Sequence, residues 1–76
     1  MARLTEEQVK EVVIGFIKQK YPNAHHISFT NIQFKGDLSQ YWVDAFFRVD
    51  MTEAMCIYCR IESETGRITY HSFSLY

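Results

Sequence analysis

The pattern of apolar positions divides the chain into a helical part and a longer extended part. Between residues 9 and 17 the apolar residues recur at three- and four-residue spacings, which places them on one face of a helix: Val9, Val12, Val13, Phe16 and Ile17. After Pro22 the period changes to two, which is typical of β-strands, and strand-forming residues continue to the C-terminus. We therefore predict one amphipathic helix followed by a sheet.

Local signals mark both ends of the predicted helix. Thr5 and Gln8 have the spacing of a capping box, and Leu4 and Val9 that of a hydrophobic staple. Pro22 disfavours the α conformation at the residue before it. The helix is therefore expected over about 5–21, with one face packed on the sheet.

Alternating apolar positions predict four strands, at about 26–35, 41–51, 55–62 and 67–75. The second strand has one almost wholly apolar face that continues to Met51. A turn is expected at Thr52-Glu53-Ala54, and a hairpin loop with Gly66 at the position that needs a positive φ. The fold class is α+β: an N-terminal helix on one face of a curved four-stranded antiparallel sheet, order α-β-β-β-β, in a single domain over residues 1–76.

Changes of apolar phase predict an irregularity in each outer strand. In the first strand one extra residue near Thr30-Asn31 explains why the apolar phase changes there. In the last strand Ile68 and Tyr70 share one phase, whereas Phe73 and Leu75 share the other. A second irregularity is therefore expected near His71-Ser72.

Composition and charge narrow the class of protein. The 76 residues are 47% hydrophobic, 16% aromatic and 22% charged, which is enough apolar surface for one folded core. The formal net charge of -1 argues against a nucleic-acid or anionic-membrane partner. No apolar run approaches the roughly 18 residues of a membrane span and no signal region is apparent, so we expect a cytoplasmic protein. Domains this small often need a partner chain, which favours a homodimer.

The cysteine and histidine residues do not predict catalytic or metal chemistry. Cys56 and Cys59 form a C-x-x-C motif, but residues three apart on a strand point to opposite faces with Cα atoms roughly 10 Å apart, too far for a disulfide. We expect both to be reduced. His25 and His26 are adjacent in an extended segment and are expected to face opposite ways. No catalytic, cofactor or metal residues are predicted, and the protein is not expected to be an enzyme.

The second face of the sheet is the more informative feature. A single helix covers one face only, so the other should be exposed, and it carries residue types that dominate interface hot spots: Trp42, Phe46, Arg48, Tyr58 and Arg60. We expect a non-enzymatic interaction or inhibitory module that binds a second copy, through this face or an edge strand, or a protein partner. A merely solvated face and the recognition of a small apolar ligand remain open.

An alternative is a small-ligand-binding protein or a small enzyme. Its pocket would lie between the helix and the bent sheet. His71 or Asp44 would be its polar group. A pocket-free core in that place would contradict this alternative.

The segment from Tyr58 to Ile68 resembles the end of a PepSY domain, where a strand runs into a hairpin of the type D-A-x-T-G-x-V. Here the hairpin reads Glu62-Ser63-Glu64-Thr65-Gly66-Arg67-Ile68, with Glu-Ser in place of Asp-Ala. The order of elements is similar to that family and, more loosely, to cystatin-like folds. The resemblance implies a binding or inhibitory module acting on peptidases or the cell envelope, without catalytic residues to carry over.

Overall fold

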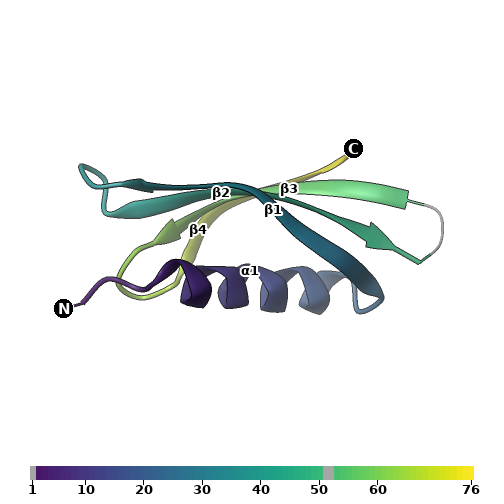
Figure 1. Cartoon of the computed structure of the whole chain (residues 1–76), viewed down its shortest axis with the longest axis horizontal. Helices are drawn as coiled ribbons and strands as arrows, with labels where there is room; N and C mark the ends of the chain where they lie inside the picture. Colours follow the sequence, from purple (N-terminus) through teal and green to yellow (C-terminus); the bar gives the residue numbers. More distant parts are fainter. Residues whose placement is uncertain (1, 51–52) are drawn as a thin grey trace.

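The computed structural model describes residues 2–50 and 53–76 and contains one helix and one sheet. The helix α1 is followed by four strands: α1 (Glu6–Lys20), β1 (Ala24–Lys35), β2 (Gln40–Val49), β3 (Glu53–Glu62) and β4 (Ile68–Leu75). Consecutive strands pair antiparallel in the order β1-β2-β3-β4, so β1 and β4 are the edges of the sheet (Figure 1). The predicted α+β fold and its α-β-β-β-β order are confirmed.

The capping box predicted for the helix start is present. The Thr5 hydroxyl accepts a hydrogen bond from the Gln8 backbone N–H at 3.2 Å, and the Gln8 side chain accepts one from the Thr5 N–H at 2.8 Å. These two bonds satisfy amides that have no partner within the helix. The helix ends at Lys20, before Pro22. Within the part of the chain that the structure describes, no helix has the length and apolarity to cross a membrane.

The core lies between α1 and one face of the sheet (Figure 1). The helix contributes Val9, Val13 and Ile17, all fully buried, at the spacing predicted from the sequence. The central strands contribute the facing layer: Tyr41, Val43, Ala45 and Phe47 from β2, and Ile57, Cys59 and Ile61 from β3. The chain before the helix is tied to this layer, because the Tyr41 hydroxyl donates to the Leu4 carbonyl oxygen at 2.7 Å. The opposite side of the sheet is not covered by another described element.

Strand β1 contains two irregularities rather than one. The expected extra residue lies between Phe29 and Asn31, which confirms the prediction. The second lies between His25 and Ser28, where His26 adopts a φ of 53°. This backbone turn brings the His25 and His26 rings together, with a hydrogen-bond contact between their Nδ1 atoms and ring centroids 4.7 Å apart. The prediction that the two histidines face opposite ways was therefore wrong, because it assumed a regular strand.

The irregularity of β4 lies closer to its start than the sequence pattern indicated. Ile68 pairs with Ile61 and Tyr70 with Arg60, so the extra residue is Thr69 rather than one near His71-Ser72. Ile68 and Tyr70 consequently face opposite sides of the sheet. The shared phase predicted for them was wrong because the bulge separates them.

The connections between strands differ in one respect from the expected turns. Glu53 and Ala54, expected in a turn, belong to β3 and pair with Val49 and Arg48 of β2. The expectations for Met51 and Thr52 lie outside the described residues. The loop before β4 has Gly66 at a φ of 77°, as predicted.

Candidate functional site

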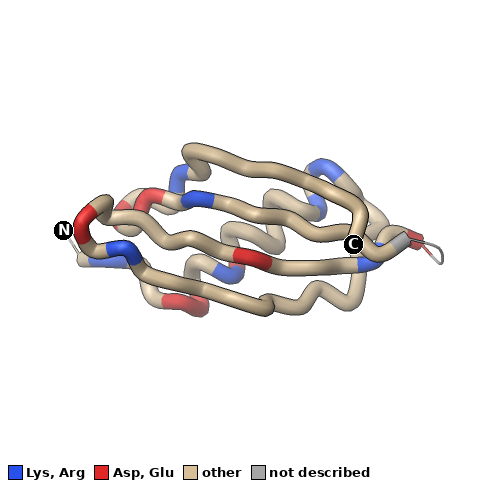
Figure 2. Tube along the Cα trace, turned by 90° about the horizontal axis from the view of Figure 1, so that it is seen from above, with Lys and Arg blue, Asp and Glu red and all other residues tan. Residues whose placement is uncertain are grey.

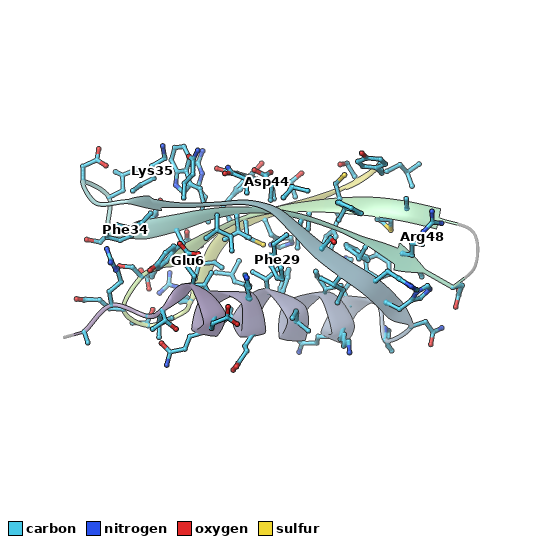
Figure 3. The ribbon with its side chains drawn as sticks, in the orientation of Figure 1. Glu6, Phe29, Phe34, Lys35, Asp44 and Arg48 are labelled. Atoms are coloured by element: carbon cyan, nitrogen blue, oxygen red, sulfur yellow. The ribbon has the colours of Figure 1, made fainter. Side chains whose placement is uncertain are left out.

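The candidate site is the side of the sheet that faces away from α1, which we call the open face. Side chains alternate across a strand, so β2 presents its core residues to the helix and the residues between them to the open face. Figure 3 shows Lys35 and Asp44 on this side and Phe29 between the sheet and the helix. All four strands contribute side chains to the open face.

At one end of the open face, cations and aromatic rings alternate across the four strands. We call this group the cation–aromatic stack, and it consists of Lys35, Trp42, Arg60, Tyr58 and Tyr70. The Lys35 Nζ atom and the Arg60 Cζ atom each lie 4.7 Å from the Trp42 ring centroid. Arg60 also lies 5.8 Å from the Tyr58 ring and 5.5 Å from the Tyr70 ring. These distances are in the range of cation–π attraction.

Hydrogen bonds and sheet register hold the stack in place. Arg60 is the cross-strand partner of both Trp42 and Tyr70, which puts the three side chains side by side. The Arg60 Nε–H donates to the Tyr58 hydroxyl at 3.0 Å, and the Trp42 indole N–H donates to the Gln40 Oε1 atom at 3.1 Å. Trp42, Arg60 and Tyr58 are thus each held by a side-chain hydrogen bond. Among the described residues, neither cation of the stack forms an ion pair.

A shallow cavity of about 280 Å³ lies beside the stack on the open face. Asp44 and Phe46 of β2 line it together with residues of β1, β3 and the C-terminal end: Thr30, Cys56, Tyr58, Ser72, Ser74 and Tyr76. The Phe46 and Tyr76 rings stack with centroids 5.5 Å apart. Within residues 2–50 and 53–76 the Asp44 carboxylate has no hydrogen-bond or ion-pair partner. The cavity therefore combines a free negative charge with aromatic walls.

The structure divides the five residues predicted for this face among three places. Trp42, Tyr58 and Arg60 meet in the cation–aromatic stack. Phe46 belongs to the Asp44 cavity. Arg48 is exposed near the opposite end of β2, where it lines a separate open hollow with Asn23, His25 and Asp50. Arg48 therefore does not take part in the stack.

Sequence reasoning missed three residues of the open face. Phe34 pairs with the core residue Tyr41 and therefore lies on the helix side of β1. Alternation then places the next residue, Lys35, on the open face, so the sequence did contain a signal for it. Tyr70 was missed because the apolar pattern indicates an irregularity near His71-Ser72, whereas the bulge lies at Thr69. Tyr76 follows the last strand, and its contact with Phe46 joins segments thirty residues apart in the sequence.

The two cysteines lie on opposite faces, as the strand geometry predicted, and both are free. Cys56 lines the open-face cavity, whereas Cys59 is fully buried in the core. Burial raises the pKa of the Cys59 thiol from 9.0 to about 12, and the negative charge of Asp44 adds to this effect. Cys59 is therefore protonated and unreactive at neutral pH.

The residues considered for the alternative pocket are also separated. Asp44 lies on the open face, while His71 lies on the helix side, edge-on to the Phe16 ring at 4.9 Å. The two cannot serve one site. A cavity of about 220 Å³ does lie between the start of α1 and β1, lined by Glu6, Lys10 and residues 29–32, but it contains neither of them. Among the described residues, no three His, Cys, Asp or Glu side chains come together as a metal site.

Comparison with known proteins found no matching family model, no similar curated protein and no similar solved structure. The likeness to PepSY and cystatin-like domains therefore rests on the hairpin residues and the order of elements alone.

Proposed function

We propose that this chain is a non-enzymatic protein-interaction module, acting as a homodimer, whose open face binds an acidic segment of a partner protein. The observation that carries the proposal is the position of Trp42 between two cations, Lys35 and Arg60, each 4.7 Å from its ring. Tryptophan, tyrosine and arginine are the residue types most enriched in interface hot spots. Here they form one cluster on a face that no other described element covers.

Pre-ordering of the stack supports a role in binding. Immobilising a flexible side chain at an interface costs about 0.5–1.5 kcal/mol. Arg60 and Trp42 are already held by hydrogen bonds to Tyr58 and Gln40, so part of this cost is met in the free protein. A partner that lies on the rings gains apolar contact without having to order them first.

Charge complementarity supports an acidic partner. Lys35 and Arg60 lie on the rings without a carboxylate in ion-pair contact among the described residues. A glutamate or aspartate of the partner would supply the missing counter-charge beside the apolar contact. Such an interaction weakens with salt, because exposed charges are screened over about 8 Å at physiological ionic strength.

The proposal can be tested with the chain's single tryptophan as the reporter. The probe is a random copolymer of glutamate and tyrosine, and a lysine–tyrosine copolymer of the same length is the control. We expect the Glu–Tyr copolymer to change the Trp42 fluorescence in a saturable, salt-sensitive manner. Lys35→Met and Arg60→Met should each weaken this response, whereas Lys18→Met, an exposed helix position, should leave it unchanged.

Two results would contradict the proposal. The first is an equal response to both copolymers, which would mean that charge does not select the partner. The second is a response that Lys35→Met and Arg60→Met leave intact, which would mean that the polymer binds elsewhere.

A second candidate function is the binding of a small organic cation in the Asp44 cavity. The observation that favours it is the Asp44 carboxylate, which has no partner among the described residues and lies beside the stacked Phe46 and Tyr76 rings. Carboxylates and aromatic faces both attract ammonium groups.

In a thermal-shift screen, aromatic amines should stabilise the protein and the matching carboxylic acids should not. Asp44→Asn should abolish the effect and Asp37→Asn, in the exposed turn, should not; stabilisation that survives Asp44→Asn rules this candidate out.

The free cysteines support a cytoplasmic location within this proposal. Cys56 and Cys59 are unpaired and face opposite sides of the sheet, so they cannot bridge within one copy. Free thiols of this kind persist in reducing compartments. Fractionation of cells that express the tagged chain tests this directly, with recovery outside the cytosol as the contradicting result.

A further inference from the structure

The outer edge of β4 presents backbone groups that have no partner in the sheet. The Tyr76 N–H donates to the Ala54 carbonyl oxygen at 3.0 Å, which fixes the alternation of the β3–β4 hydrogen bonds. By this alternation Ser72 and Ser74 exchange hydrogen bonds with β3. His71, Phe73 and Leu75 are the intervening residues, so their N–H and C=O groups point away from β3, toward the free edge.

The β4 edge lacks the features that usually prevent strands from pairing. Residues 69–76 include no charged residue, proline or glycine, and Figure 2 shows the β4 tube without Lys, Arg, Asp or Glu along its whole length. The other edge of the sheet is different. Strand β1 is interrupted at His26 and at Thr30, and it ends in a lysine. An added strand would therefore fit β4 and not β1.

Exposed apolar side chains gather at the same edge. Five large apolar residues are exposed in the described part of the chain, and three of them belong to β4 or follow it directly. Tyr70 is 50% exposed, Leu75 70% and Tyr76 80%. Phe73, which faces the helix, is only half-buried against Phe16. Apolar side chains are thus exposed along the β4 edge on both faces of the sheet.

We propose that two copies of this chain pair antiparallel through their β4 edges, about a twofold axis at Phe73, to form one continuous sheet. In this register the outward N–H groups of His71, Phe73 and Leu75 donate to the outward C=O groups of Leu75, Phe73 and His71, respectively, in the second copy. Tyr70 of each copy lies opposite Tyr76 of the other on the open face, and Leu75 lies opposite His71 on the helix face. Cross-strand pairs of this kind stabilise sheets. All three exposed apolar side chains of the edge gain a partner.

The second copy is the occupant that this edge fits. An antiparallel strand pair about a twofold axis is self-complementary, so the same surface serves both copies. An edge without charges brings no like charges together when two copies meet. The axis is perpendicular to the sheet, so both open faces stay on one side and uncovered. The inference rests on the self-association in the proposed function. Of the cation–aromatic stack only Tyr70 enters the interface, and Lys35, Trp42 and Arg60 stay accessible to a partner.

Amide hydrogen exchange on the full chain tests the pairing residue by residue. The amides of Ser72 and Ser74 bond to β3 and should be protected at every concentration. The amides of His71, Phe73 and Leu75 should exchange rapidly in dilute protein and become at least tenfold slower at high concentration. If these three amides stay fast while sedimentation reports a dimer, the copies meet elsewhere and the inference is wrong.

Matched leucine substitutions provide an independent test. Leu75→Lys places a charge on the proposed interface, and Leu38→Lys makes the same change in the exposed turn between β1 and β2. We expect sedimentation equilibrium to give a dimer for the wild type and Leu38→Lys, and a monomer for Leu75→Lys. A wild-type monomer at millimolar concentration, or a dimer unaffected by Leu75→Lys, would overturn the inference.

The same variant separates this inference from the proposed function. Monomeric Leu75→Lys keeps the cation–aromatic stack, so it should still respond to the Glu–Tyr copolymer through Trp42. Loss of dimerisation with retained binding supports both ideas. If the wild type dimerises but its Trp42 fluorescence does not respond to the copolymer, the edge pairing is supported and the proposed acidic partner is contradicted.

Discussion

Trp42 and Arg60 are direct cross-strand partners on the open face, with the guanidinium carbon of Arg60 4.7 Å from the Trp42 ring centroid. The pair joins β2 to β3 at the point where the stack also reaches Lys35 on one side and Tyr70 on the other. Because the side chains are only partly exposed, their attraction should contribute to stability as well as to binding.

The energy of this pair can be measured by a double-mutant cycle. Unfolding of Trp42→Leu, Arg60→Met and the double variant in urea should give a coupling of about 0.5–1 kcal/mol, the usual size of a partly exposed cation–π pair. The same cycle with Arg67→Met, an exposed arginine in the β3–β4 loop, should give none. A coupling of zero for the Trp42 and Arg60 pair would mean that the contact does not hold in solution.

The helix and the central strands could be predicted from the sequence because their signals are local. The capping box at Thr5 and Gln8 acts within one turn, and the alternation along β2 and β3 is uninterrupted. In regular strands, alternation alone decides which face a side chain occupies. The sequence alone therefore places Trp42, Tyr58 and Arg60 on the same face.

The edge strands could not be predicted to the same depth because their irregularities depend on packing. The bulge at Thr69 reverses the side on which Tyr70 lies, and its place is set by how β4 docks on β3. The positive φ of His26 likewise brings two histidine rings together against the usual alternation. The Asp44 cavity needs Tyr76 to stack on Phe46, a contact without a local signal.

The buried Cys59 thiol should make the protein less stable in alkali. Burial, with the charge of Asp44, raises its pKa to about 12 in the folded state, against 9.0 without these effects. The folded state therefore favours the neutral thiol: its contribution is complete below pH 9 and is lost as the pH rises toward 12. Urea unfolding between pH 8 and 11 should show a steeper loss of stability for the wild type than for Cys59→Ala. Parallel curves for the two proteins would contradict the raised pKa.

Gly66 should be the glycine that tolerates substitution least. It has a φ of 77°, and an added Cβ would lie 3.2 Å from Leu4 Cδ1. Gly66→Ala should therefore cost about 1–2 kcal/mol, the penalty of the left-handed conformation for a residue with a side chain. At Gly36 an added Cβ would make an ordinary contact of 3.5 Å with the Phe34 ring, and Gly36→Ala should change stability by about 0.5 kcal/mol or less. Equal effects at the two positions, measured by urea unfolding, would contradict this difference.

The Tyr41 hydroxyl should anchor the segment before the helix to the sheet. Tyr41 is 3% exposed and donates to the Leu4 carbonyl oxygen, while the Leu4 N–H donates to the Ser63 carbonyl oxygen at 2.7 Å. Tyr41→Phe removes the donor and should lower the free energy of unfolding by about 1–2 kcal/mol, because it leaves the partly buried Leu4 carbonyl oxygen without its bond. The Leu4 amide should then exchange faster with solvent, since only its own bond to Ser63 still holds the segment. Tyr21→Phe is the matched control: the Tyr21 hydroxyl has no hydrogen bond among the described residues, so this variant should unfold at nearly the wild-type urea concentration. If both variants lose the same stability, the loss comes from removing a hydroxyl group as such and not from the bond to Leu4.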